Sequence, residues 1–114
     1  MARSVLIVDD HDGFRSSARA LLEAGGFVVA GDAATGAEAV AAADRLRPDV
    51  VLLDIQLPDL DGFTVAARLT GLADPPVVVF VSSRDAVTYG PRLRGARFLP
   101  KHELSGPALS GLLG

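Results

Sequence analysis

Short segments that are apolar throughout alternate along this chain with longer segments in which apolar residues recur at helical spacing. The clearest apolar segments are residues 5–8, 50–53 and 77–81, which are rich in β-branched side chains, as is typical of strands buried on both faces. Residues 27–30 and 98–99 are weaker strand candidates. The pattern therefore predicts five short strands.

Four other segments have the spacing and the boundary residues of helices. In the first, apolar residues share one helical face, Asp12 is the expected N-cap, and Gly25 gives the stop signal. The second begins with a capping box from Thr35 to Glu38 and is expected to end near Leu46. The other two are predicted over residues 62–71 and 103–113.

Alternating strands and helices predict parallel strands joined by right-handed crossovers, and therefore an α/β fold with a doubly wound sheet. A length of 114 residues is enough for one core but not for two, so residues 1–114 are expected to form a single domain. The hydrophobic fraction of 49% and the mean hydropathy of +0.34 exclude a disordered chain.

Composition also excludes several classes of function. No apolar run approaches the ~20 residues that a membrane span needs, and the first residues lack the pattern of a signal peptide. Cysteine is absent, which excludes disulfides and thiolate metal sites. A net charge of −3 without a basic run argues against direct binding of nucleic acid. We therefore expect a cytoplasmic domain that binds neither a membrane nor a nucleic acid.

Polar side chains directly follow four of the predicted strands. Asp9 and Asp10 follow the first strand, Asp54 closes the third, Ser82 follows the fourth and Lys101 follows the fifth. Because parallel strands deliver their carboxyl ends to one edge of a sheet, we expect these side chains to lie close together. Three carboxylates, a hydroxyl and an ammonium are the parts of a site that binds a divalent metal ion and a phosphoryl group.

The residue types favour Mg²⁺ as the cofactor. Aspartates that converge in a small volume repel one another unless a cation neutralises them. Mg²⁺ takes oxygen ligands, usually one or two carboxylates together with waters and a phosphate oxygen. Asp54 could then attack an activated phosphoryl group as a nucleophile. Lys101 and the metal ion would supply positive charge to the transition state, and Ser82 would donate a hydrogen bond.

The whole combination resembles the receiver domain of two-component response regulators over nearly the full length of the chain. An acidic pair, a mid-chain aspartate with proline four and glycine eight residues later, a hydroxyl after the fourth strand and a late lysine form a highly specific set. The segments that carry the resemblance are Val8-Asp9-Asp10-His11, Asp54-Ile55-Gln56-Leu57-Pro58 with Asp61-Gly62, Ser82, and Gly95-Ala96 before Phe98-Leu99-Pro100-Lys101. The resemblance implies a flavodoxin-like, five-stranded parallel sheet with strand order 2-1-3-4-5. The Asp-Asp-His and Phe-Leu-Pro-Lys segments resemble the subgroup with a LuxR-type helix-turn-helix output domain.

The resemblance also implies roles at the metal and phosphoryl site. Asp54 would be the phospho-acceptor, and Lys101 would contact the phosphoryl group. Asp10 chiefly, or Asp9, would hold Mg²⁺ together with Asp54 and the backbone carbonyl of Gln56.

Further residues would control the response to phosphorylation. Ser82 would be the switch hydroxyl, and Phe98, three residues before the lysine, matches the switch aromatic of the family. Gln56 and Arg84 would flank the path of the hydrolytic water and so tune the lifetime of the phosphoryl group.

A sensor histidine kinase is the partner that the resemblance implies, and transcription is the expected output. The domain would not be an enzyme beyond promoting its own phosphorylation and dephosphorylation. A homodimer and a C-terminal DNA-binding output domain in a longer protein are left open as further partners.

One segment departs from the family. The interval from Ser82 to Lys101 is shorter than usual, and Gly90-Pro91 interrupts the place of the fourth helix. We expect that helix to be short or irregular. The usual signalling face of the family comprises this helix and the fifth strand, so its output geometry stays open here.

Two other classes of function compete with this interpretation. A phosphotransferase of the haloacid-dehalogenase type also uses a strand-end aspartate, but it needs a second aspartate two residues later, where Gln56 stands. A pseudo-receiver is an interaction module that usually lacks the acceptor, the acidic pair or the lysine, all of which are present. His11 is expected to be a rim side chain and not a ligand, because Mg²⁺ disfavours imidazole. Asp59 and Asp61 are expected to be loop carboxylates.

Overall fold

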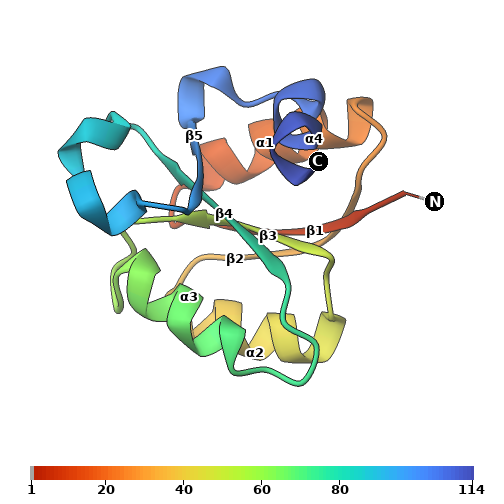
Figure 1. Ribbon diagram of the computed structural model, residues 1–114. Helices are drawn as coiled ribbons and strands as arrows, with labels where there is room; N and C mark the ends of the chain where they lie inside the picture. The colour runs from red at the N-terminus through yellow and green to blue at the C-terminus, as the bar shows by residue number, and fades with distance from the viewer. Residues whose placement is uncertain (1) are drawn as a thin grey trace.

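The computed structural model describes residues 2–114 as a parallel sheet covered by helices on both faces (Figure 1). The strand order is β2-β1-β3-β4-β5, which confirms the predicted doubly wound topology. Helices α1 and α4 cover one face, and α2 and α3 cover the other. The strands are β1 (Ser4–Val8), β2 (Val28–Ala33), β3 (Val50–Asp54), β4 (Val77–Ser82) and β5 (Arg97–Pro100).

The helices vary more in length than the strands, from 3 to 13 residues. Within residues 2–114, no helix is both long enough and apolar enough to cross a bilayer. The α-helices are α1 (Asp12–Ala24), α2 (Gly36–Leu46), α3 (Gly62–Thr70) and α4 (Gly106–Leu113). The described residues also include three short 3₁₀-helices: η1 (Ala86–Thr88), η2 (Gly90–Leu93) and η3 (Lys101–Glu103).

The sheet separates two hydrophobic clusters, one beneath each helical layer. Leu6 and Val8 face the layer of α2 and α3, whereas Val5 and Ile7 face the layer of α1 and α4. All residues of the central strand β3 are buried, as the apolar run of residues 50–53 predicts for a strand covered on both faces. The strand ends beyond this core are therefore held on a rigid platform.

Capping side chains explain where two of the helices begin. The Thr35 hydroxyl accepts a hydrogen bond from the Glu38 backbone at 3.1 Å, so the predicted start of α2 is confirmed. The prediction that the last helix begins at residue 103 is wrong. It begins at Gly106, because the Ser105 hydroxyl caps it and Pro107, which has no N–H to donate, is tolerated only in a first turn.

Two further boundaries differ from their predictions. His11, not Asp12, occupies the N-cap of α1, and Asp12 instead lies in the first turn as the ion-pair partner of Arg15. Strand β2 continues past residue 30 to Ala33, because β1 pairs with it through Val8. The apolar pattern predicts a shorter strand because the polar residue Asp32 lies within β2.

The fourth helix of the expected fold is replaced by the two 3₁₀-helices η1 and η2, which confirms the prediction of a short or irregular element. Gly90, the first residue of η2, has a φ of 55°, a left-handed conformation that interrupts a continuous α-helix. Pro91 follows it and cannot donate a backbone hydrogen bond. The chain therefore turns twice between β4 and β5 instead of forming one continuous helix.

Candidate functional site

The polar residues predicted from the strand ends meet at the carboxyl edge of the sheet. Asp9 directly follows β1, Asp54 ends β3, Ser82 ends β4 and Lys101 directly follows β5. These four strands are adjacent in the order β1-β3-β4-β5. Strands β1 and β3 are neighbours although β2 lies between them in sequence, which makes this the switch point where open α/β sheets bind ligands.

Lys101 lies between two buried carboxylates. Its Nζ is 2.5 Å from Asp9 Oδ2 and 3.4 Å from Asp54 Oδ2. The Asp9 side chain is fully buried, and only 5% of the Asp54 side chain is exposed. The ammonium also lies 4.6 Å from the centre of the Phe14 ring, which favours a cation at this position. One positive charge therefore neutralises part of a buried acidic pair.

The two oxygens of Asp9 have different surroundings. Oδ1 accepts a hydrogen bond from the His11 backbone at 2.8 Å and lies 2.9 Å from His11 Nδ1. Oδ2 is buried and has no aligned hydrogen-bond donor, although the Lys101 ammonium is close to it. Burial acts to raise the pKa of Asp9, but Lys101 and the hydrogen bonds from His11 outweigh it and hold that pKa below its ordinary value.

The pKa of Asp54 moves in the opposite direction. Burial and the nearby charge of Asp9 raise it to about 6, against the opposing effects of Lys101 and the Gln56 backbone. Burial acts to lower the pKa of Lys101, but the two carboxylates outweigh this and raise it. Around neutral pH the cluster therefore has more negative than positive charge, and it favours an additional cation.

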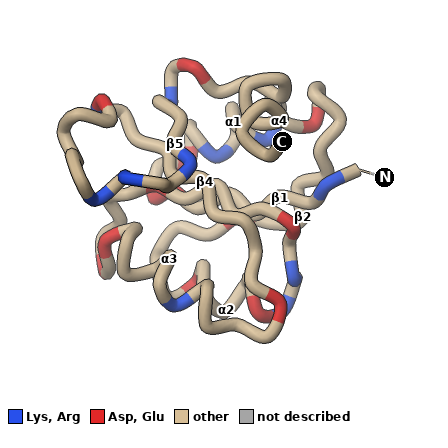
Figure 2. Tube along the Cα trace, viewed as in Figure 1, with Lys and Arg blue, Asp and Glu red and all other residues tan. Residues whose placement is uncertain are grey.

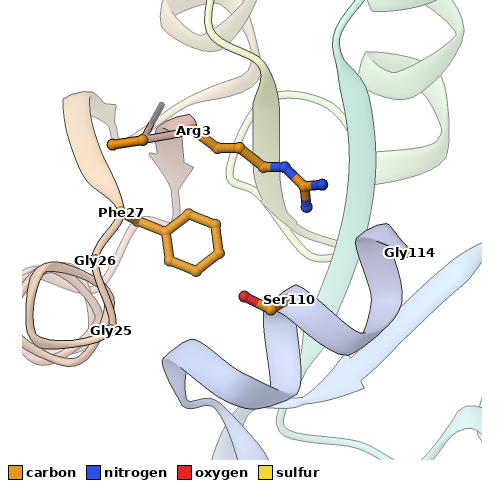
Figure 3. Close-up of a pocket in the computed structure, with 7 residues that line it drawn as sticks. Arg3, Gly25, Gly26, Phe27, Ser110 and Gly114 are labelled. Carbon is orange, nitrogen blue, oxygen red and sulfur yellow. The ribbon is translucent and has the colours of Figure 1, made fainter.

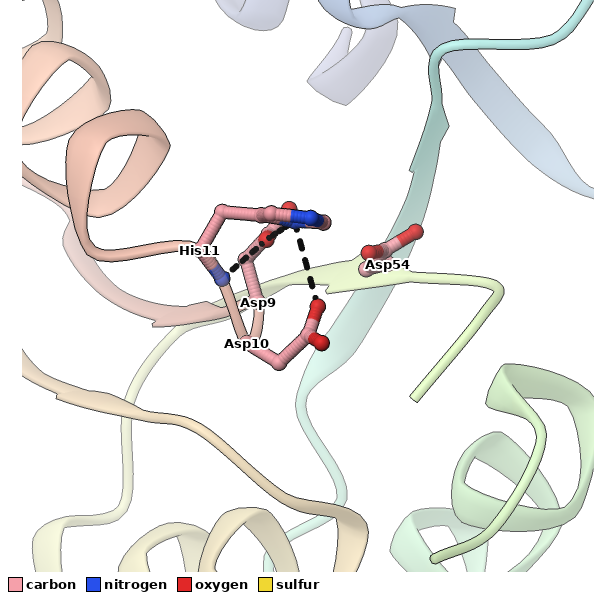
Figure 4. Close-up of side chains that lie close together, drawn as sticks. All are labelled: Asp9, Asp10, His11 and Asp54. Carbon is pink, nitrogen blue, oxygen red and sulfur yellow. Dashed lines mark hydrogen bonds and ion pairs between the residues drawn. The ribbon is translucent and has the colours of Figure 1, made fainter. Parts of the chain in front are cut away.

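The geometry fits a divalent metal ion. Asp9, Asp10, His11 and Asp54 each place one candidate ligand atom within 4.8 Å of the others (Figure 4). Asp9 Oδ2 is a buried oxygen without an aligned donor, which is the kind of atom that a metal ion can satisfy. Carboxylate oxygens are the ligands that Mg²⁺ prefers. The residues present therefore fit the expected ion.

His11 lies at the rim of this cluster. Its side chain is 69% exposed, in agreement with the expectation of a rim side chain. Its Nδ1 nevertheless points toward the acidic pair and lies 3.1 Å from Asp10 Oδ1 (Figure 4). The imidazole therefore contacts both aspartates that follow β1.

The loop after Asp54 is folded tightly back onto the end of β3. The Gln56 backbone donates a hydrogen bond to Asp54 Oδ1 at 3.2 Å, and Gln56 also pairs with Asp61 in a single antiparallel bridge. The Gly62 backbone donates to the Ile55 carbonyl at 2.6 Å. The backbone N–H of Gln56 in this loop therefore helps to orient the Asp54 carboxylate.

Two carboxylates of this loop cap helices, a role that the sequence interpretation missed. Asp61 accepts a hydrogen bond from the Thr64 backbone at 2.8 Å and is the N-cap of α3. Asp59 accepts from the Gly36 backbone at 2.7 Å and from the Ala37 backbone at 3.0 Å, so it caps α2 from a distant loop. These hydrogen bonds lower the pKa of both carboxyl groups. The aspartate-rich loop thus joins the end of β3 to two helices.

Ser82 is buried and has a partner that sequence reasoning did not identify. Its Oγ lies 2.7 Å from the hydroxyl of Tyr89 and accepts a hydrogen bond from the Arg84 backbone at 3.0 Å. The Tyr89 ring lies 6.5 Å from the ring of Phe98, the predicted switch aromatic, which is half-buried on β5. The only sequence signal for Tyr89 is its position next to Gly90-Pro91, within reach of the end of β4.

Another groove lies at the opposite edge of the sheet and has no comparable chemistry. It has a volume of about 340 Å³ and is bordered by Arg3, Phe27 and Ser110, with Gly25 and Gly26 at the end of α1 (Figure 3). None of its lining residues is acidic or a histidine. The acidic edge is therefore the better candidate for a functional site.

Comparisons with known proteins agree with this geometry. The family model described as response regulator receiver domain matches residues 5–101. The positive alginate biosynthesis regulatory protein of Pseudomonas aeruginosa is 45% identical over 84 residues, which cover 72% of this chain and 34% of that protein. A protein-glutamate methylesterase/protein-glutamine glutaminase of Anaeromyxobacter dehalogenans is 49% identical over 79 residues, which cover 68% of this chain and 23% of that protein.

Solved structures of the same fold include a DNA-binding response regulator of the LuxR family from Staphylococcus aureus. It has a TM-score of 0.86 and 20% sequence identity over 98% of this chain and 99% of that one. At this identity the likeness shows the fold alone. The fold and the acidic edge thus define a receiver-like α/β domain.

The chain belongs to the response regulator receiver domains, which are signalling domains of two-component systems. It spans between about a quarter and a third of the length of the two curated relatives named above. Their names describe the whole proteins, of which this chain matches only a part.

Proposed function

We propose that the domain accepts a phosphoryl group on Asp54 in a reaction that depends on Mg²⁺. The observation that carries this proposal is the position of Lys101 Nζ, which lies 2.5 Å from Asp9 and 3.4 Å from Asp54 at the switch point of the sheet. A buried carboxylate pair with one ammonium provides a nucleophile and a fixed positive charge for a group that carries negative oxygens.

Asp54 is the nucleophile in this proposal. Its Oδ attacks the phosphorus of a phosphohistidine on a sensor kinase, and a P–O bond forms while the P–N bond breaks. The leaving imidazole nitrogen keeps the bonding electron pair and takes up a proton from solvent. Asp54 must be ionised to attack, and its pKa of about 6 leaves it mostly ionised at neutral pH.

The other residues hold the metal ion and the transferred oxygens. Asp9, Asp10, Asp54 and the Gln56 backbone carbonyl would hold Mg²⁺, which when bound supplies positive charge to the phosphoryl oxygens. Lys101 would exchange part of its contact with Asp9 for a phosphoryl oxygen. The Ser82 hydroxyl would donate a hydrogen bond to another oxygen.

A basic segment beside the site supports an anionic phosphodonor. Residues 84–97 contain four arginines and one aspartate, and they form the blue-rich connection on the left of Figure 2. Local positive charge raises the concentration of anions near a site. A sensor histidine kinase is the proposed donor in the cell, and control of transcription through a DNA-binding output domain is the proposed output.

The decisive experiment is incubation of the domain with acetyl phosphate and Mg²⁺, followed by intact-protein mass spectrometry. We expect a mass gain of one phosphoryl group that disappears with a chelator and in Asp54→Asn. Asp44→Asn, which changes an exposed carboxylate on α2, is the control and should keep the label. Equal labelling of Asp54→Asn would contradict the proposal, and complete absence of label would favour a pseudo-receiver.

Asp10 offers a second test, because its side chain is exposed and its loss should leave the fold intact. Asp10→Asn should weaken Mg²⁺ binding and slow phosphorylation without changing the unfolding midpoint by more than a few degrees. Mg²⁺ affinity equal to that of the wild type would remove Asp10 from the proposed metal site.

A further inference from the structure

Tyr89 connects the candidate site to the irregular segment between β4 and β5. Its hydroxyl lies 2.7 Å from Ser82 Oγ, and the Ser82 side chain is almost fully buried at the end of β4. Tyr89 itself stands at the junction of η1 and η2. The hydrogen bond therefore joins a residue inside the site to the segment that replaces the fourth helix.

Aromatic and charged contacts fix the Tyr89 ring in this position. Its centre lies 6.1 Å from that of Phe63 on α3 and 6.5 Å from that of Phe98 on β5. The Arg92 guanidinium lies 4.1 Å from the centre of the Phe63 ring and 3.7 Å from Asp61, which holds η2 against the same helix. The hydroxyl of Tyr89 is thus directed toward Ser82 by packing on two sides.

We propose that Tyr89 is a positioning residue that holds the Ser82 hydroxyl in its unphosphorylated position and is released when Ser82 turns to a phosphoryl group. This inference rests on the proposed function of Asp54. The Ser82 oxygen accepts a hydrogen bond from the Arg84 backbone and shares a second one with Tyr89, in which either hydroxyl can be the donor. Turning the Ser82 hydroxyl toward phosphoryl oxygens exchanges the Tyr89 partner for a charged one.

The exchange gives the site a direct connection to the surface. A hydrogen bond to a phosphoryl oxygen is charge-assisted and therefore stronger than the neutral bond between two hydroxyls. Tyr89 then has a half-buried phenol without its partner, and such a group must find another partner or move. Either response changes the positions of η1 and η2, which carry the exposed side chain of Val87.

The composition of the chain supplies an unusually clean probe. Tyr89 is the only tyrosine of the sequence, and tryptophan is absent. Tyrosine absorption and fluorescence therefore report on Tyr89 alone. Beryllofluoride with Mg²⁺ is the probe for the phosphorylated state, because it mimics a phosphoryl group on a carboxylate. We expect a change in the Tyr89 spectrum of the wild type, absent in Asp54→Asn. Ser82→Ala should show a change of the same sign before beryllofluoride is added.

Removal of the phenol oxygen should favour the bound state. Tyr89→Phe keeps the ring and removes the hydrogen bond, so the affinity for beryllofluoride should rise about 2- to 10-fold, the range of one neutral hydrogen bond. In a Ser82→Ala background the same substitution should have no effect, because the partner is missing. Thr88→Val removes an exposed hydroxyl from the adjacent position and should leave the affinity unchanged.

The results separate this inference from the proposed function. A phosphoryl mass gain on Asp54 with an unchanged Tyr89 spectrum overturns the role of Tyr89 and leaves the acceptor assignment standing. An equal effect of Tyr89→Phe with and without the Ser82 hydroxyl also overturns it, because the effect would then come from packing. Failure of Asp54 to gain a phosphoryl group overturns both.

Discussion

The backbone of Gly62 lies directly against the backbone of Asp54. A Cβ on Gly62 would be 2.6 Å from the Asp54 carbonyl oxygen and 2.7 Å from the Ile55 Cα, distances that no side chain tolerates against rigid backbone. The glycine eight residues after the strand-end aspartate is thus required by close approach, since its φ is not positive. It allows α3 to begin directly against the end of β3, where the proposed acceptor Asp54 lies.

This contact makes Gly62→Ala a specific test of how the acceptor is held. The added methyl group must push the loop away from β3, which should lower the free energy of unfolding by about 1–3 kcal/mol and slow phosphorylation of Asp54. Urea unfolding and the rate of labelling by acetyl phosphate measure the two effects. Gly13→Ala is the matched control, because a Cβ there meets no atom within 4 Å, and it should not destabilise the domain. Equal stability of both variants would contradict this account.

The raised pKa of Asp54 predicts an unusual dependence of stability on pH in metal-free buffer. The folded state binds this proton more tightly than the unfolded state, since burial and Asp9 raise the pKa from 3.8 to about 6. Stability from Asp54 should therefore be greatest below pH 3.8, fall as the pH rises to about 6, and then stay constant.

Asp54→Asn removes this titration and isolates its effect. With a chelator present, the variant should be more stable than the wild type at pH 7 by about 1–3 kcal/mol, and this advantage should vanish near pH 4. Thermal unfolding of both proteins across this range measures the difference. The opposite result would be a stability difference, variant minus wild type, that falls between pH 4 and pH 7. It would show that the attraction of Lys101 for the Asp54 carboxylate outweighs the cost of burying it.

Gln56 and Arg84 are proposed to tune the lifetime of the phosphoryl group. Both side chains are exposed and follow the ends of β3 and β4 at the same interval. Substitution of either residue by alanine should change the rate of dephosphorylation more than the rate of phosphorylation. Decay of the phosphoryl mass after removal of the donor gives the first rate. If neither rate moves, these two side chains do not line the path of the hydrolytic water.

The segment of η1 and η2 should exchange its amide hydrogens faster than the sheet. Its hydrogen bonds span only three residues, as in the bonds from Thr88 to Asp85 and from Arg94 to Pro91, and most of the segment is exposed. Hydrogen exchange followed by mass spectrometry should show early labelling of residues 86–94 and late labelling of β3. Equal protection of the two segments would mean that the segment of η1 and η2 is as rigid as the sheet.

The sequence predicts most of the site because strand ends are easy to locate. Four apolar strands that each end in a polar residue place Asp9, Asp54, Ser82 and Lys101 at one edge once the sheet is parallel. The parallel, doubly wound class of sheet then follows from the alternation of strands and helices, whereas the strand order is implied only by the resemblance to the receiver family.

The remaining features depend on tertiary contacts that no local pattern contains. Asp59 caps α2 across 23 residues of sequence, and Tyr89 reaches Ser82 across a segment whose path depends on Gly90 and Pro91. The predicted start of α4 at residue 103 differs from the observed one because residues Lys101–Glu103 form a separate 3₁₀-helix just before it. These cases involve caps and turns, where a single side chain determines where an element begins or which residues come into contact.

The most direct test of the central claim is to locate the phosphoryl group chemically. Borohydride reduces an aspartyl phosphate to homoserine, so the domain treated with acetyl phosphate and Mg²⁺ can be reduced, digested and sequenced by mass spectrometry. We predict homoserine at position 54 alone, and none when Mg²⁺ is removed. Homoserine at another aspartate, or a phosphoryl group stable to reduction, would contradict the assignment of Asp54 as the acceptor.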